Sequence, residues 1–485
     1  MKKLLAVLLL VAFVISIAGC GSKKDSGLED DQTQSAELVW YLIGPKPKDF
    51  DKVMAKVNEY TKEKLNCTIK AEMIDFGDYD AKMKTVATAG DNVDIMFTCS
   101  WAFDYKQNAM RGVFYPLTEL LPKYGQDMTK LMDPRLFEAS KINGVNYVIP
   151  ANMGAFQQSY IFDKKFVGQY GFDFAAVKKE SDLIPLFDKV RAANPGLKML
   201  RHSSWVEGRD IFDYVFSAGF PGAVRFTDNS CKVVNQFEDP EFIAILKDCR
   251  KMYLGEYTYR DIKEGTDSDF NAGKVACEVQ NAGGPFVVTD IERVTNFPVI
   301  VQPVFAKPII TTDIISGSMM AISATSKNPA RAMKLINMLN SDPYMHNLLA
   351  FGIEGEHYKK LNDKQIEITK LGKENYSMPV WTLGNNKINY LLSDQPLDYN
   401  EKMQAYTDSA AVSPIFGFVF DPSPVLSEIG ALNNINAEYI TALKSGSVDV
   451  DAGLKDYNAK IKAAGWEKVL AELQKQVDEW KKAKK

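Results

Sequence analysis

Histidine is scarce in this sequence, and the motifs that most often hold metal ions are missing. The chain of 485 residues has three histidines, His202, His346 and His357, and no Cys-x-x-Cys or His-Glu-x-x-His motif. Residue spacing therefore gives no case for a metal site. The formal net charge of −4 gives no electrostatic case for a nucleic-acid partner. No second long apolar run follows the one at the N-terminus, so no membrane-spanning helix is predicted beyond it.

Disulfide pairing also has little support. Of the six cysteines, one closes the N-terminal apolar run, and an odd number remains. At least one of the remaining thiols must therefore lack a partner within the chain. Cys67, Cys99 and Cys277 lie in apolar runs and are predicted to be buried. Cys231 with Cys249 is the single pair that we consider for a disulfide.

The N-terminal 20 residues have the pattern of a secretion signal. Two lysines precede an apolar run over residues 4–17, which is shorter than the roughly 20 residues that a bilayer span needs. Residues 17–20 (Ile-Ala-Gly-Cys) resemble a bacterial lipobox, in which Cys20 becomes the lipidated first residue of the mature chain. The alternative is an ordinary cleaved signal with an incidental cysteine. Residues 21–36 are small, polar and charged, which is typical of a flexible tether and favours lipidation.

The chain of 485 residues, 46% of them hydrophobic, can bury large cores and should form two or more domains. Residues 37–43, 68–74 and 93–98 have the composition or alternating polarity of strands. Between them, apolar residues recur at helical spacing over 50–65, and a second helix is predicted over 79–89. Strands that alternate with helices in this order predict a parallel sheet covered by helices.

The ends of these strands indicate a ligand site. In open α/β sheets, ligands bind beyond the carboxyl ends of the strands. Gly44 follows the first predicted strand, and Trp101 and Asp104 follow the third. An indole at this rim can stack on a sugar ring or an aromatic ligand, and we expect Trp101 to do so. The alternative is that Trp101 packs under the following helix. Trp40, inside the first strand, is predicted to be core.

A further set of elements predicts a second lobe. Residues 160–163 and 198–201 have strand character, and Trp205 follows the latter as a second rim tryptophan. We expect the chain to cross between the lobes at residues 147–152 and to return at 297–303.

Several loop residues have two interpretations each. Gly283 and Gly284 indicate either a close backbone approach to a ligand or a simple turn. Trp381 lies in a loop rich in proline, glycine and asparagine, where it is either a third stacking platform or part of the core. Glu354 and His357 have the spacing of a metal or acid–base pair, but the flanking glycines favour a structural loop.

Several segments connect the chain to a known family by resemblance. Residues 317–323 (Gly-Ser-Met-Met-Ala-Ile-Ser) are followed at 326–332 by Ser-Lys-Asn-Pro-Ala-Arg-Ala. Together they resemble a segment of bacterial extracellular solute-binding proteins of the carbohydrate-specific type, the lipoprotein receptors of ABC importers, although Ala330 stands where glutamate is usual. Residues 352–358 and 413–434 resemble a subgroup with an extra C-terminal region of unassigned function. The resemblance covers essentially the whole mature chain.

This resemblance implies a periplasmic-binding-protein-like α/β fold, in which two Rossmann-like lobes are joined by hinge crossings and additional helices follow at the C-terminus. The expected division is a lipoprotein signal peptide (1–20), a tether (21–36), an N-terminal lobe (37–149 and 299–345) and a C-terminal lobe with a helical extension (150–298 and 346–485).

Two function classes fit these features. One is a receptor whose two lobes close on a solute, and the other is a surface-anchored glycan-active enzyme, such as a glycoside hydrolase with paired carboxylates. Because the sequence has 62 aspartates and glutamates, a carboxylate pair can always be nominated and decides nothing. The repeated lobe pattern and the family segments favour the receptor, and we expect no enzymatic activity. Rim tryptophans favour an oligosaccharide, since a zwitterion site needs a placed Arg–Asp pair.

The expected site and partners follow from this interpretation. The candidate ligand-binding residues are Trp101, Trp205 and Trp381 for stacking, Asp104, Asn152, Glu278, Asn281 and Asn385 for hydrogen bonds to hydroxyls, and Gly44 at the rim. The resemblance implies the permease subunits of an ABC transporter as partners. We expect a monomer without cofactor or metal, anchored through Cys20 to the extracytoplasmic face of the cell membrane.

Overall fold

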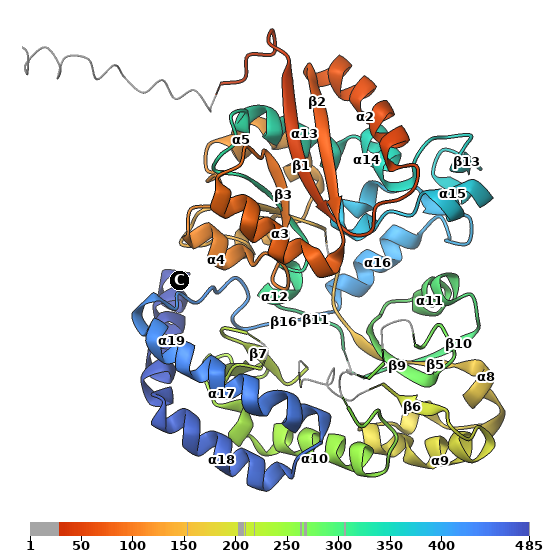
Figure 1. Ribbon diagram of the computed structural model, residues 1–485, viewed down its shortest axis with the longest axis vertical. Coiled ribbons are helices and arrows are strands. Elements are labelled where there is room, and N and C mark those ends of the chain that lie inside the picture. The colour runs from red at the N-terminus through yellow and green to blue at the C-terminus, as the bar shows by residue number, and fades with distance from the viewer. Residues whose placement is uncertain are drawn as a thin grey trace, which may run out of the picture.

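Two α/β lobes, one above the other in Figure 1, make up the described part of the chain. The computed structural model describes residues 29–484, except 153, 202–207, 209, 218, 262–263, 266–268 and 305–306. Cys20 and Trp205, both singled out in the sequence, lie outside the described residues.

The first lobe is built on a five-stranded sheet, in the upper part of Figure 1. Its strand order is β2 (Cys67–Ile74), β1 (Ala36–Ile43), β3 (Ile95–Thr98), β12 (Met319–Ile322) and β4 (Val148–Pro150). β1 pairs in parallel with β2 and β3, whereas β12 is antiparallel to both of its neighbours. The parallel strands predicted over residues 37–98 are therefore confirmed.

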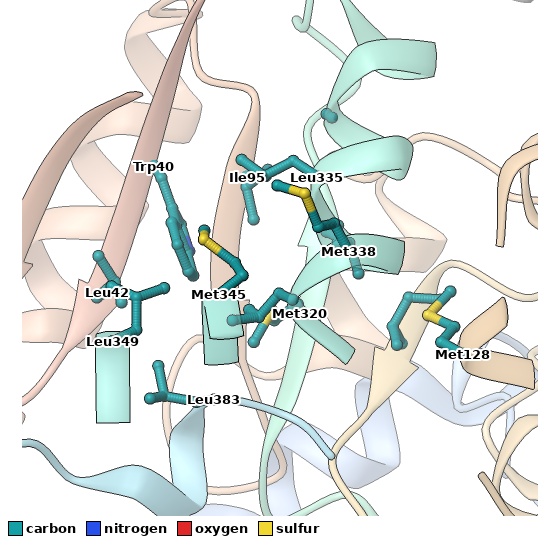
Figure 2. Packing of buried hydrophobic residues seen from close by; sticks show 14 of the residues in the cluster. Trp40, Leu42, Ile95, Met128, Met320, Leu335, Met338, Met345, Leu349 and Leu383 are labelled. Atoms are coloured by element: carbon teal, nitrogen blue, oxygen red, sulfur yellow. The ribbon is translucent and has the colours of Figure 1, made fainter. Parts of the chain in front are cut away.

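Helices pack on both faces of this sheet. They are α2 (Phe50–Leu65), α3 (Phe76–Ala89), α4 (Tyr105–Met110), α5 (Leu120–Tyr124), α6 (Gln126–Leu131), α7 (Pro134–Ala139), α13 (Pro329–Ser341) and α14 (Pro343–Phe351). On one face Trp40, 2% exposed, packs among side chains that include Met338 of α13 and Met345 of α14 (Figure 2). On the other face Tyr79 of α3 packs against Phe97 of β3. The prediction that Trp40 is core is confirmed.

Residues 346–392 pack with the first lobe, whereas the sequence analysis assigned them to the second. Tyr376, Met378 and Leu383 are buried in the same core as Trp40. This segment also forms β13 (Tyr358–Lys360), β14 (Gln365–Ile368), β15 (Leu391–Leu392) and α15 (Lys370–Asn375). Sequence periodicity indicates that an element exists, but it does not show which core the element joins.

The second lobe contains a four-stranded sheet, in the lower part of Figure 1. Its order is β10 (Val299–Pro303), β5 (Gln158–Asp163), β9 (Val275–Asn281) and β6 (Lys198–Leu200). The flanking helices include α8 (Lys164–Val167), α9 (Ile184–Ala193), α10 (Pro240–Leu254) and α11 (Val287–Thr295). Because β10 pairs along its length with β5, residues 299–303 belong to this sheet. The return crossing expected at 297–303, and the assignment of 299–303 to the first lobe, are therefore wrong.

The C-terminal helices complete the second lobe. α17 (Leu426–Ser445), α18 (Val450–Ala463) and α19 (Trp466–Ala483) lie beside α10 on the outer side of that lobe in Figure 1. They share one hydrophobic cluster with α10 and with the hairpin of β7 (Phe212–Tyr214) and β8 (Ala223–Arg225). The packing is close, since a Cβ on Gly222 would lie 2.7 Å from Cδ1 of Leu473. The extension is thus part of the lobe's core.

Three segments of the chain meet between the lobes. Phe156 forms an antiparallel bridge with Ile309, and β11 (Ile309–Ile310) pairs in parallel with β16 (Ala411–Val412). α12 (Thr312–Ile315) follows β11 and leads into the first-lobe sheet, while α16 (Tyr399–Asp408) precedes β16. The crossing expected at 147–152 begins within β4, and the crossing at 411–412 was missed by the sequence analysis.

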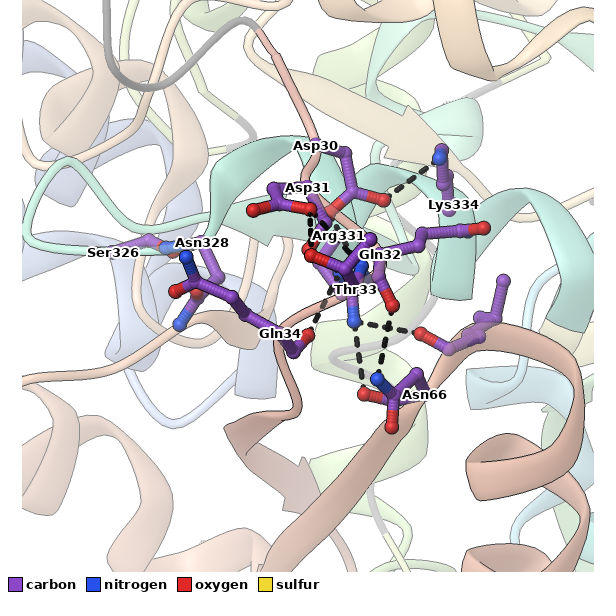
Figure 3. Close-up of polar contacts among 11 residues, drawn as sticks. Asp30, Asp31, Gln32, Thr33, Gln34, Asn66, Ser326, Asn328, Arg331 and Lys334 are labelled. Atoms are coloured by element: carbon purple, nitrogen blue, oxygen red, sulfur yellow. Dashed lines mark hydrogen bonds and ion pairs between the residues drawn. The ribbon is translucent and has the colours of Figure 1, made fainter.

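The described end of the expected tether is bound to the body. The Arg331 guanidinium, on α13, bonds to Oδ1 of Asp30 at 2.6 Å and to the carbonyl oxygens of Leu65 and Asn66 at 2.6 and 2.9 Å. Lys334 lies 2.7 Å from the other carboxylate oxygen of Asp30 (Figure 3). Both charged side chains of the central pair are buried, with 3% and 6% of their surfaces exposed. Described residues before the predicted boundary at residue 37 are therefore bonded to the body.

The cysteines of the described chain are buried and none of them forms a disulfide. The pairing considered for Cys231 and Cys249 is therefore wrong. Among the helices that the structure describes, none has the length and apolar character needed to span a membrane. Within the same residues, no group of three or more His, Cys, Asp and Glu side chains is placed to hold a metal ion.

Candidate functional site

An exposed tryptophan lies at the carboxyl end of β3. Trp101 has 51% of its surface exposed, so the alternative in which it packs under α4 is excluded. Its indole Nε1 donates a hydrogen bond to the carbonyl oxygen of Gly317 at 2.8 Å. The ring nitrogen therefore bonds within the protein while about half of the residue stays exposed.

Other aromatic rings support Trp101. Trp381, in a short 3-10 helix (Val380–Thr382), and Phe97 each have ring centroids 6.0 Å from that of Trp101. Phe76, the first residue of α3, is stacked on Trp381 at 6.0 Å and is itself 39% exposed. Trp381 is half-buried against the first-lobe core. The four rings form what we call the aromatic platform: Phe76, Phe97, Trp101 and Trp381.

The loop that carries Trp101 is fixed by local bonds. The backbone N–H of Ser100 donates to the Ser316 carbonyl at 2.8 Å, and Phe103 takes a left-handed backbone with φ 46°. Asp104 caps α4, since its carboxylate accepts from the N–H of Gln107 at 2.8 Å. Burial raises the pKa of Asp104 above its usual value, in opposition to that hydrogen bond. Asp104 is half-buried, and its carboxylate caps α4 in this structure.

Gly44 lies at the same rim for a steric reason. Its φ is +122°, and a Cβ there would lie 2.8 Å from Cγ of Pro379 and 3.4 Å from the ring of Phe76. A side chain would therefore push apart the loop that carries Trp381 and the ring of Phe76. The absence of a side chain at Gly44 thus allows the rings of the aromatic platform to pack together. The sequence alone could not distinguish this packing role from ligand contact.

Asn152 and Asn385 also converge on this rim. Asn152 donates through Nδ2 to Oδ1 of Asn385 at 3.2 Å. Asn385 is fully buried, and its backbone N–H and side-chain amide bond to Asn340 at 2.8 and 3.0 Å. The prediction that Asn385 contacts ligand is wrong for this conformation, because its amide joins internal segments. Asn152 is half-buried and remains a candidate.

The candidates of the second lobe lie on β9. Asn281 is the last residue of that strand and is exposed, while Glu278 is half-buried and accepts from Nε2 of Gln280 at 3.0 Å. Gly283 and Gly284, two and three residues further on, approach α16 closely. A Cβ on Gly283 would lie 2.2 Å from the Tyr406 hydroxyl, and one on Gly284 would lie 3.0 Å from Sδ of Met403.

His357 is an internal brace. It is fully buried, its Nδ1 accepts from the N–H of Ile353 at 2.9 Å, and its Nε2 lies 3.1 Å from the Asp49 carboxylate. The hydrogen bond from His357 holds the pKa of Asp49 below its usual value. Glu354 instead forms an ion pair with Lys360 at 2.9 Å. The structural interpretation of this loop is supported.

The sequence analysis missed Phe76 and Gly317. Phe76 follows β2 closely, so the rule that singled out Gly44 and Trp101 could have found it. Nothing in the sequence showed that the Gly317 carbonyl would receive the indole N–H, because the partners are 216 positions apart.

Comparisons with known proteins identify the family. Residues 44–346 match the family described as bacterial extracellular solute-binding protein, and residues 414–482 match a domain of unknown function. A carbohydrate ABC transporter substrate-binding protein of Streptococcus pneumoniae is 32% identical over 98% of this chain and 97% of its own length.

Solved structures give the same result. The crystal structure of the N-glycan transport solute binding protein (NgtS) from Streptococcus pneumoniae has a TM-score of 0.85 and 30% identity, and covers 93% of this chain and 100% of that one. NgtS in complex with Man5GlcNAc gives a TM-score of 0.80 with the same identity and coverage. The periplasmic-binding-protein-like fold is confirmed, and these relatives support the receptor and not the enzyme alternative. The chain therefore belongs to the bacterial extracellular solute-binding proteins.

Proposed function

We propose that this protein is a receptor that binds an oligosaccharide between its lobes and delivers it to the permease of an ABC transporter. The observation that carries the proposal is Trp101, half-exposed at the carboxyl end of β3 with its ring nitrogen bonded to Gly317. Sugars have an apolar C–H face that a flat indole can cover. The proposed contacts are Trp101 with Phe76 for stacking, and Asn152, Glu278, Asn281 and Asp104 for hydroxyls.

The relatives support a glycan ligand of more than one sugar unit. NgtS was crystallised with Man1GlcNAc and with Man5GlcNAc, at 29% and 30% identity to this chain. Trp381 fits a supporting role under the aromatic platform, since it is half-buried and stacked on Phe76. Because the family consists of binding proteins, we propose no catalytic activity.

A thermal-shift screen tests the ligand class. The chain from residue 21 onward is mixed with a panel of oligosaccharides, amino acids and peptides. A ligand that binds only the folded state at about 100 times its Kd adds about 2.7 kcal/mol to the free energy of unfolding. We expect a rise in Tm with at least one glycan. A rise with an amino acid or peptide, and none with any glycan, would contradict the proposal.

Membrane attachment is the second part of the proposal. Acyl chains on Cys20 would each add about 0.8 kcal/mol per buried CH₂, and two or more chains hold a protein stably at a bilayer. Cys20→Ser should release the protein from the membrane or leave it as unprocessed precursor. Membrane-bound protein of mature size in that variant would exclude the lipid anchor.

A further inference from the structure

A helix that lies between the two lobes is bonded to both of them. In Figure 1, α16 lies at the lower edge of the first lobe, next to α11 of the second lobe. On the first-lobe side, Nδ2 of Asn400 donates to the carbonyl oxygen of Lys387 at 3.2 Å. On the second-lobe side, the Tyr399 hydroxyl donates to Oδ2 of Asp290 on α11 at 2.8 Å. The ring of Tyr399 is also stacked on that of Phe286, with centroids 4.7 Å apart. The N-terminal turn of α16 therefore connects the lobes.

An ion pair joins the lobes directly beside that helix. Nε of Arg293, on α11, donates to Oδ2 of Asp394 at 2.8 Å, and Asp394 follows β15 in the chain. Nη1 of Arg293 donates to Oδ1 of Asp290 at 3.0 Å. One guanidinium thus bonds a carboxylate of each lobe. The side chains of Arg293 and Asp394 are 28% and 42% exposed, so solvent and salt screen this pair only in part.

Each end of this ion pair is held by its own lobe. α11 packs through Ile291 on a hydrophobic cluster of the second-lobe sheet. Asp394 follows β15, and the residue before that strand is bonded to α14 of the first lobe. There the Tyr390 N–H donates to Oδ1 of Asn347 at 2.7 Å. Because the two partners belong to different lobes, a change in the angle between the lobes changes the distance between Arg293 and Asp394.

We propose that the ion pair between Arg293 and Asp394 is an interlobe clamp, which stabilises the lobe arrangement of this structure against other arrangements. The hydrogen bond from Tyr399 to Asp290 is its second contact. A receptor whose lobes move is a population of arrangements, and a contact that forms in one of them shifts the population toward it. The proposal rests on the lobe movement of the proposed receptor, but it does not depend on which solute binds.

Arginine suits this position because its guanidinium is planar and donates in fixed directions. Nε is directed at Asp394 of the first lobe, and Nη1 is directed at Asp290 of the second. The same Asp290 carboxylate accepts from the Tyr399 hydroxyl through its other oxygen. The guanidinium plane therefore fixes where the first-lobe carboxylate lies relative to α11, and loss of either charge of the pair removes that constraint.

Electron–electron double resonance on the ligand-free chain from residue 21 tests the proposal. Spin labels are placed at Lys82→Cys on α3 and Lys455→Cys on α18, both exposed and in different lobes, while the native cysteines of the described chain are buried. The measured quantity is the ratio of molecules at the main label distance of the wild type to molecules at other distances. We expect Asp394→Asn to lower this ratio about threefold, as for a partly exposed ion pair, and Arg293→Met about fivefold. The double variant should add little to Arg293→Met, because both changes remove the same contact.

Two matched variants serve as controls. Arg135→Met breaks an arginine–aspartate pair inside the first lobe, and Glu374→Gln breaks an exposed pair inside α15. Both should leave the distances unchanged. The proposal is overturned if Asp394→Asn keeps the wild-type distribution, even if Arg293→Met alters it, because Arg293 would then act within α11 alone. If Arg293→Met does not fold, Asp394→Asn decides. No ligand is present, so the outcome is independent of the proposed glycan specificity.

Discussion

Trp101 and Gly317 are joined by a hydrogen bond of 2.8 Å from the indole nitrogen to the backbone carbonyl oxygen. The bond connects the loop after β3 with the segment that enters the sheet from the crossing. It fixes the plane of the indole while 51% of the residue stays exposed. A ring that is already held in place loses less conformational freedom when a ligand covers it.

Trp381→Ala tests the support under that ring. Because Trp381 is half-buried, we expect a loss of roughly 2 kcal/mol in unfolding free energy, below the value for a fully buried aromatic, together with weaker glycan binding. Urea unfolding and glycan titration measure the two effects. Trp480→Ala is the matched control, since Trp480 is also half-buried but packs on Phe418 in the second lobe. Equal affinities in both variants would show that Trp381 does not support the site.

Arg331→Met tests whether the segment before β1 is pinned to the body. Removal of one partner from a buried ion pair costs about 3–5 kcal/mol, because the other charge stays buried. We expect a loss of that size in chemical denaturation. Arg135→Met should cost about 1 kcal/mol or less, since Arg135 pairs with Asp133 at the surface. Equal losses of unfolding free energy in the two variants would show that the Arg331 ion pair does not hold this segment to the body.

His346→Asn tests a pH dependence. His346 is fully buried on α14, its Nδ1 lies 2.9 Å from the Leu339 carbonyl oxygen, and burial lowers its pKa from 6.5. Below that value the unfolded chain takes up a proton that the folded protein excludes. The contribution of His346 to the free energy of unfolding is therefore complete above pH 6.5. It is lost as the pH falls toward the pKa of the folded state, by at most about 1.4 kcal/mol per pH unit.

The asparagine amide can keep the bond to Leu339 but takes up no proton. Urea unfolding at pH 5.5 and 7.5 should therefore show a smaller difference in the variant than in the wild type. The same difference in both proteins would mean that His346 does not contribute to the pH dependence.

Leu473→Ala tests whether the C-terminal helices are part of the second lobe's core. Leu473 is fully buried on α19, so we expect a loss of about 2–5 kcal/mol. Leu426→Ala, at a leucine of α17 that is 64% exposed, should change stability by less than about 0.5 kcal/mol. Unfolding followed by intrinsic fluorescence measures both. A neutral Leu473→Ala would indicate a detachable extension.

The local order of the first lobe could be predicted because it depends on near neighbours. Apolar spacing indicates α2, and chain order then places Trp101 at the carboxyl edge of the sheet. By contrast, the position of β12 between β3 and β4 depends on partners far away in the chain, which periodicity does not report. The same limit explains why residues 346–392 were assigned to the wrong lobe.

The roles of individual site residues were harder to predict than their neighbourhood. Gly44 and Asn385 do lie near the aromatic platform, as expected. However, a side chain at Gly44 would collide with Pro379. The backbone N–H and the side-chain amide of Asn385 are hydrogen-bonded to Asn340. Pro379 and Asn340 are distant in sequence from Gly44 and Asn385. The sequence could therefore indicate that these residues lie at the edge of the sheet, but it could not distinguish ligand contact from packing.

The most direct test of the account is an isothermal titration of the wild type and Trp101→Ala with the glycan that gives the largest thermal shift. A buried tryptophan covers about 150–250 Å², and at roughly 25 cal/mol per Å² the loss of a third of that contact costs on the order of 1–2 kcal/mol. We predict at least about tenfold weaker binding, with unfolding free energy little changed, and no effect of Tyr344→Ala, an aromatic residue that is 54% exposed on α14. Wild-type affinity in a folded Trp101→Ala protein would contradict the account.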